Sequence, residues 1–193
     1  MRVRGVLGVV TIAVCAVAGE TAAQSAQPWS LQASLLAASQ KIGTSAISGL
    51  GFEGQLRYTP VSNWTLGVGL QTSSHESGDE SISITGVFVE PRYTLPYGTD
   101  RLAPYLAGRL AFLQESATLY SGTTLFDVSS WGSAFGAGAG LLILGTERIN
   151  IDIGAAFVSQ SFGDASSGGT TFEFARFTGY VAKAGLSFGF GTR

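Results

Sequence analysis

The feature that most constrains this chain is an alternation of apolar and polar residues that recurs from residue 29 to residue 190. A period of two places successive side chains on opposite faces of a β-strand, whereas an amphipathic helix needs a period near 3.6. The alternation occurs in eight segments, whose apolar positions run over 29–37, 52–58, 64–70, 87–95, 106–112, 135–143, 149–157 and 180–190. The pattern therefore predicts an all-β protein with eight strands.

The stretch from Val128 to Thr146 is uncharged and is long enough to be weighed as a membrane-spanning helix. It contains glycines at positions 132, 136, 138 and 140, and each would weaken a helix by about 1 kcal/mol relative to alanine. Its larger residues also alternate with these small ones, so we expect a strand. In the fourth segment, Ile82 and Ile84 have the opposite parity to Val87 and Val89, which predicts a β-bulge near Thr85 to Gly86.

The connections between the eight segments alternate in length. Short turns are expected at 60–63, 96–101 and 145–148, and longer polar loops at 40–48, 73–80, 116–130 and 161–171. Short turns at one rim and long loops at the other are typical of up-and-down barrels in the bacterial outer membrane. We therefore predict a transmembrane, antiparallel, eight-stranded up-and-down β-barrel.

The distribution of charge indicates which face of the strands looks outward. Only 12% of the residues are charged, against about 25% in an ordinary globular domain, and 45% are hydrophobic. Too few charges lie on the strands to solvate the outside of a barrel, so we expect the apolar face to contact lipid. The charged residues on polar strand faces are expected to form an ion-pair network that plugs a closed, polar lumen, and they are Glu53, Arg57, Glu90, Arg92, Arg109, Asp152 and Lys183.

Aromatic residues are expected to form a belt at each membrane interface. Near the short turns lie Tyr58, Trp64, Tyr93, Tyr97, Phe188 and Phe190, and near the long loops lie Trp131, Phe172 and Phe174. The net charge of −2 supplies no basic surface for nucleic acid, so no nucleic-acid partner is expected.

The N-terminus has the pattern of a secretory signal peptide. Arg2 and Arg4 precede an uncharged run from Gly5 to Gly19, and Ala23-Gln24-Ser25 fits a small-x-small cleavage site, with Thr21-Ala22-Ala23 as a second candidate. We expect a cleaved signal peptide over residues 1–25 and a barrel domain over 26–193. Cleavage would remove Cys15, the single cysteine, leaving neither a disulfide nor a thiolate metal site.

The C-terminal segment resembles the assembly signal of bacterial outer-membrane barrels. In Lys183-Ala184-Gly185-Leu186-Ser187-Phe188-Gly189-Phe190 the polar, glycine and hydrophobic positions of that signal are present, with Gly185, Phe188 and Phe190 as its elements. Pro104 to Leu110 and the glycine-alanine run at 136–140 are similar to segments of the OmpA/OmpX-like eight-stranded outer-membrane β-barrel superfamily. The resemblance covers residues 28–190 and implies an outer-membrane location, a monomer, and the barrel assembly machinery as a partner.

The sequence offers little enzyme chemistry. His75 is the only histidine, and His75-Glu76-Ser77 resembles a His-x-Ser arrangement of some outer-membrane lipid A deacylases, whose residues sit on a lipid-facing strand. We expect His75 in a solvated loop instead, and therefore predict no catalytic residues. Glu76, Asp79 and Glu80 lack the ligand pattern of a calcium loop, and one histidine cannot form a zinc site, so no metal or cofactor is expected.

These observations predict an outer-membrane protein with a structural or surface-interaction role through its extracellular loops. The alternatives are a lipid A-modifying hydrolase and a periplasmic lipocalin-like carrier. Arg176 has the parity of the lipid-facing residues in the last strand, and we expect it at the outer headgroup level, where it would contact a lipopolysaccharide phosphate. A bulge near Phe177 that turns Arg176 inward is the other possibility.

Overall fold

The fold was obtained as a computed structural model, which describes residues 27–42, 45–77, 80–121, 124–163, 165–167, 170–172 and 176–191. The expected signal peptide lies outside these residues. The strands are β1 (Trp29–Ile42), β2 (Ser45–Val61), β3 (Trp64–Ser77), β4 (Glu80–Thr94), β5 (Leu102–Ser121), β6 (Thr124–Leu144), β7 (Ile149–Phe162), β8 (Ala165–Ser167), β9 (Thr170–Phe172) and β10 (Phe177–Phe190).

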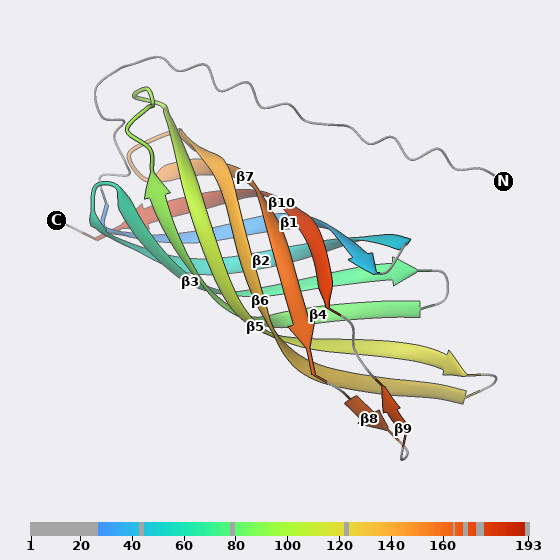
Figure 1. Cartoon of the computed structure of the whole chain (residues 1–193). Coiled ribbons are helices and arrows are strands. Elements are labelled where there is room, and N and C mark those ends of the chain that lie inside the picture. The colour runs from blue at the N-terminus through green and yellow to red at the C-terminus, as the bar shows by residue number, and fades with distance from the viewer. Residues whose placement is uncertain are drawn as a thin grey trace.

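Eight of these strands form one closed antiparallel barrel in the order β1-β10-β7-β6-β5-β4-β3-β2. The barrel closes where β1 pairs with β10, from Trp29 opposite Phe190 to Lys41 opposite Thr178. Figure 1 shows the strands crossing the barrel at a steep tilt, which closure of a twisted sheet requires. The short β8 and β9 form a separate hairpin in the connection between β7 and β10. The eight-stranded all-β prediction is confirmed.

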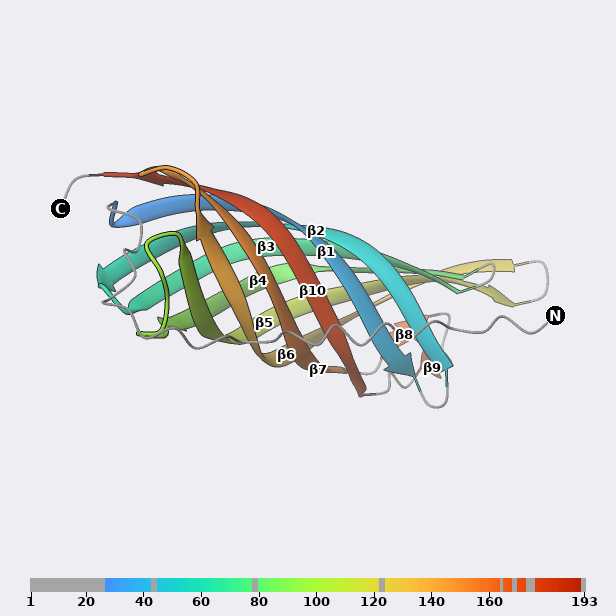
Figure 2. The same ribbon diagram turned by 90° about the horizontal axis from the view of Figure 1, so that it is seen from above.

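The two ends of the barrel differ, and we call them the turn end and the hairpin end. At the turn end, β2 joins β3 through Ser62 and Asn63, and the other connections span residues 95–101 and 145–148, as predicted. At the hairpin end, β1–β2, β3–β4 and β5–β6 continue as paired strands, and the β5–β6 hairpin projects beyond its neighbours (Figures 1 and 2).

The prediction of long irregular loops is therefore wrong for most of those residues. The strand ladder runs through residues 45–48, 73–77, 116–121 and 124–130, where β5 and β6 pair as far as Ser121 and Thr124. Their polar composition suggested loops, but a paired ladder satisfies the backbone whether or not the side chains are apolar. Within the described ranges, no helix is long and apolar enough to span a membrane. The predicted strand over the glycine-rich stretch is confirmed as part of β6.

The outside of the barrel is apolar. Leu35, Leu70 and Leu186 are 69%, 65% and 60% exposed, and many other large hydrophobic side chains share this surface. A continuous apolar surface of this extent is stable against lipid but not against water. The face that the sequence assigned to lipid is thus the outer one.

Aromatic pairs lie at both ends of this apolar surface. Trp29 packs on Tyr58 with ring centroids 4.5 Å apart at the turn end. Phe112 stacks on Trp131 at 5.1 Å on the hairpin side. Pairs of this kind fit the two interfacial belts expected from the sequence. Phe174, and the side chain of Phe172, lie outside what the structure describes.

Part of the interior is apolar, which corrects the expectation of a polar lumen. The register between β3 and β4 passes without interruption through Thr72–Thr85 and Gln71–Gly86, so the predicted bulge is absent. Ile82 and Ile84 therefore point into the lumen, together with the rest of an apolar cluster. Its buried members are Ile84, Phe88, Ala111, Leu113, Ala134, Val158, Phe162 and Phe177. The parity of the isoleucines indicated inward side chains, which the sequence analysis misread as a bulge.

Candidate functional site

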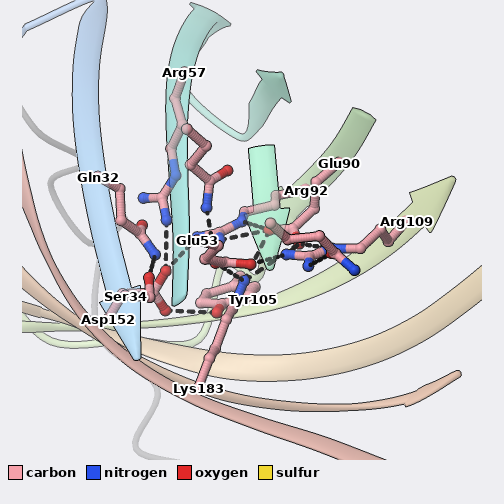
Figure 3. Close-up of polar contacts among 12 residues, drawn as sticks. Gln32, Ser34, Glu53, Arg57, Glu90, Arg92, Tyr105, Arg109, Asp152 and Lys183 are labelled. Carbon is pink, nitrogen blue, oxygen red and sulfur yellow. Dashed lines mark hydrogen bonds and ion pairs between the residues drawn. The ribbon is translucent and has the colours of Figure 1, made fainter. Parts of the chain in front are cut away.

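Seven charged side chains meet inside the half of the barrel nearer the turn end (Figure 3). They are the seven named from the sequence: Glu53 and Arg57 on β2, Glu90 and Arg92 on β4, Arg109 on β5, Asp152 on β7 and Lys183 on β10. Each occupies an inward position of its strand, because period-two alternation places the flanking residues on the lipid side. We call this set the lumen network.

Asp152 is the first anionic centre of the lumen network, and its side chain is fully buried. Its Oδ2 lies 2.5 Å from Nη2 of Arg57 and 2.7 Å from Nη1 of Arg92. Tyr105 donates its hydroxyl proton to the other oxygen, Oδ1, at 2.6 Å. One carboxylate thereby forms ion pairs with two guanidinium groups from different strands.

Glu90 and Glu53 form the second anionic centre. Glu90 accepts hydrogen bonds from Nε of Arg92 at 2.6 Å, from Nε of Arg109 at 2.8 Å and from Nζ of Lys183 at 3.0 Å. Glu53 lies 2.7 Å from Nη2 of Arg109 and 3.7 Å from Lys183. Because Arg92 touches both centres, the seven charges form one connected network rather than separate pairs.

Two aromatic residues support the arginines of the lumen network, and the sequence analysis did not include them. The guanidinium carbon of Arg92 lies 4.5 Å from the ring centroid of Tyr105, and that of Arg109 lies 3.9 Å from the ring centroid of Phe88. Tyr105 shares the inward parity of Arg109, which was the available signal. Phe88 belongs to the apolar cluster, so its contact with Arg109 is where the cluster meets the lumen network.

Glycines make room for the lumen network. A Cβ at Gly140 would collide with the Tyr105 hydroxyl and ring, and one at Gly154 would lie 2.8 Å from the same hydroxyl. Gly140 therefore faces a crowded part of the lumen. Glutamines complete the polar half: Arg109 donates to Gln71 at 3.0 Å, and Gln32 donates to Ser34 at 2.6 Å.

The lumen retains a cavity of about 60 Å³ between the lumen network and the apolar cluster. Lys183, Arg109 and Glu90 border it on the charged side, and Val158 and Val181 are among its apolar walls. This volume is sufficient for a few water molecules and is well below the roughly 150 Å³ of a cavity that binds benzene. The interior is consequently close to fully packed.

His75 does not lie in a solvated loop, and that prediction is wrong. It is in β3, opposite Gly49 of β2, and its side chain is 1% exposed. The side chain points into the lumen because odd-numbered residues of β3 face inward, whereas the deacylase arrangement faces lipid. Neither ring nitrogen has a hydrogen-bond partner among the described residues.

Glu115 is a second isolated polar group, on β5 just beyond the level of Trp131. It is 2% exposed, and its Oε2 has no hydrogen-bond partner. Burial raises the pKa of this carboxyl group to about 7. In the sequence, Glu115 directly precedes the stretch 116–130, which was expected to be a loop.

The remaining predicted positions lie on the barrel wall. Phe188 and Phe190 are 48% and 37% exposed on the outer face of β10. Gly185 faces inward, where a Cβ would collide with Ser34. Arg176 is exposed and directly precedes β10. Among the described residues, no group of three or more His, Cys, Asp or Glu side chains could hold a metal ion.

No protein-family model matches the chain. No curated protein matches it either. Among solved structures it is similar to Neisserial surface protein A, with a TM-score of 0.64 and 15% sequence identity over 84% of this chain and 97% of that one. It is also similar to Ail, the attachment invasion locus protein of Yersinia pestis, in its complex with the heparin analogue sucrose octasulfate. For Ail the TM-score is 0.56 and the identity 18%, over 83% of this chain and 97% of that one. These likenesses concern the fold: the chain is a closed eight-stranded antiparallel β-barrel, like the outer-membrane proteins it resembles.

Proposed function

We propose that this protein is an integral outer-membrane barrel whose lumen is closed by its own side chains and whose role is structural or surface-directed. One observation carries the proposal: an apolar outer surface surrounds an interior occupied by an ion-pair network and an apolar cluster. The outer surface suits lipid, and the side chains described inside the barrel would obstruct the passage of solutes. The turn end would face the periplasm and the hairpin end the cell exterior.

The projecting hairpins are the parts of the barrel suited to contact with molecules outside the cell. The paired strands of β5 and β6 reach furthest, so they would present a stiff surface rather than irregular loops. Neisserial surface protein A is a surface protein by its name, Ail is named for attachment and invasion, and the shared fold is consistent with a surface placement here. We propose no catalytic role, and we propose that the barrel is a monomer assembled through its C-terminal signal.

The two alternatives fit the described residues less well. A periplasmic lipocalin-like carrier needs a charged exterior and an apolar cavity of ligand size, which is the reverse of this distribution. A lipid A-modifying hydrolase would need His75 on the lipid side, but its ring is buried in the lumen.

Conductance in planar bilayers tests the proposal. The wild-type barrel should give no large, steady current because its lumen is filled. The double variant Arg109→Ala, Lys183→Ala removes two long side chains beside the 60 Å³ cavity and should raise the frequency of brief openings. As a matched control, Arg101→Ala, Arg148→Ala removes two exposed cations at the turn end and should leave the baseline unchanged. A steady, porin-sized current from the wild type would overturn the closed lumen.

A further inference from the structure

The lipid-facing surface of the barrel is not uniformly bulky, because a hollow lies across β10, β1 and β2 toward the hairpin end. Its volume is about 660 Å³. Ser39 is at its centre, paired with Tyr180 on one side and with Ser48 on the other. Its lining includes the outward side chains of Ala37, Ser39, Ser48, Leu50, Tyr180 and Ala182, and Ser74 of β3 borders it beside Leu50. We call this hollow the outer groove.

Small side chains form the floor of the outer groove and large ones form its sides. Leu50 and Tyr180 are 74% and 68% exposed, so they stand out from the barrel wall. Alanine and serine between them leave a depression wide enough to receive a hydrocarbon chain. Elsewhere on β1, outward positions such as Leu31 and Leu35 carry bulky side chains, which occupy the space that the small residues of the groove leave empty.

Two basic residues lie at the outer end of this groove. Lys41 follows Ser39 by two residues on β1 and therefore shares its outward face. Lys41 pairs in register with Thr178, and Arg176 is two residues beyond Thr178 on the neighbouring chain segment. Arg176 directly precedes β10, and diagonal neighbours across an antiparallel pair have Cα atoms about 7 to 8 Å apart, within reach of long side chains.

Both cations are exposed, and within the described part of the chain neither has an acidic partner at ion-pair distance. A charged side chain facing lipid is costly at the membrane midplane and nearly free at the interface. The position at the hairpin end therefore places Lys41 and Arg176 at the level of the outer headgroups. There they would attract an anionic group located directly above the groove.

We propose that the outer groove binds a phosphorylated saccharolipid of the outer leaflet, with an acyl chain over Ser39 and a phosphate between Lys41 and Arg176. Arginine can hold a phosphate through two parallel hydrogen bonds, and lysine adds a compact point charge. The groove supplies the complementary apolar part, so headgroup and chain are recognised together. This inference rests on the outer-membrane location proposed above and extends the role expected for Arg176.

Native mass spectrometry of the delipidated barrel in detergent, titrated with bisphosphorylated lipid A, tests the charge part of the proposal. Lys41→Gln and Arg176→Gln should each weaken retention of the lipid about fivefold, the equivalent of about 1 kcal/mol per basic residue near an anionic surface. The wild-type barrel should bind lipid A that lacks both phosphates at least as weakly as the double variant Lys41→Gln, Arg176→Gln binds the bisphosphorylated lipid. Arg101→Gln, which removes an exposed cation at the turn end, is the matched control and should leave retention unchanged.

Filling the groove tests the apolar part. Ser39→Leu should weaken retention of the same lipid severalfold, whereas Ala33→Leu, on the same face of β1 but nearer the turn end, should not. Equal binding of phosphate-free lipid, or equal losses in the control variants, would overturn the site. Heat-modifiable gel migration must be retained in every variant. If the barrel fold or membrane location were wrong, that migration shift would be missing. A missing lipid site would leave the shift intact, so failure of the proposed function and failure of the lipid site can be told apart.

Discussion

Replacing Asp152 by Asn probes the lumen network most directly. The substitution keeps the size of the side chain and removes one charge. Arg57 then loses the only carboxylate within ion-pair distance of it among the described residues. Arg92 retains Glu90 at 2.5 Å, and the Tyr105 hydroxyl can still donate to the amide oxygen that replaces Oδ1. One buried cation is therefore left uncompensated.

The expected loss of unfolding free energy follows from the number of buried cations left without an anion. Removing one partner of a buried ion pair costs about 3 to 5 kcal/mol, and because only Arg57 is left without an anion we expect about 3 kcal/mol. The double variant Asp152→Asn, Arg57→Gln removes the stranded charge as well. It should recover most of the loss, since a neutral pair of similar shape can replace a buried ion pair at little cost.

Urea unfolding in lipid vesicles, followed by tryptophan fluorescence and by gel migration, measures these free energies. Asp100→Asn, the same chemical change on an exposed turn residue, is the matched control and should stay within about 0.5 kcal/mol of wild type. A loss below about 1 kcal/mol for Asp152→Asn would refute the network as a source of stability. Strict additivity of the two substitutions would refute direct coupling between Asp152 and Arg57.

Three further outcomes are expected. Boiled and unboiled samples should migrate differently on gels because a closed strand ladder resists detergent, and identical migration together with helical circular dichroism would contradict the barrel. Gly140→Ala should destabilise the barrel by about 1 to 3 kcal/mol in urea unfolding because its methyl group would displace Tyr105, whereas Gly54→Ala, with open space around it, should be nearly neutral. Because burial raises the pKa of Glu115 from 4.5 to about 7, the folded barrel binds more protons than the unfolded chain between these values. Stability should therefore be greatest below about pH 4.5 and fall as the pH rises toward 7; Glu115→Gln should flatten this part of the profile, and an unchanged profile in that variant would exclude Glu115 as the source.

The sequence by itself determined the barrel. Period-two alternation fixes which residues of each strand share a face, and the scarcity of charge means that the apolar face must contact lipid. The same alternation identified every charged member of the lumen network. Glu53 and Arg57, for example, both occupy inward positions of one strand. These conclusions depend only on local geometry and composition, which a linear sequence contains.

Only the tertiary structure decided which inward residues meet. Arg57 and Asp152 are far apart in sequence, and they meet because the register of the strands places them at the same level of the closed barrel. The alternation along a strand specifies which face of the sheet a side chain lies on, but not its height along the barrel axis. It therefore could not show which inward residues belong to the lumen network and which to the cluster around Phe88. It also could not show that His75 is buried, because whether a polar segment continues the ladder depends on its partner strand. Closure and register are cooperative properties of the whole sheet, and they arise from pairings between distant segments rather than from any one of them.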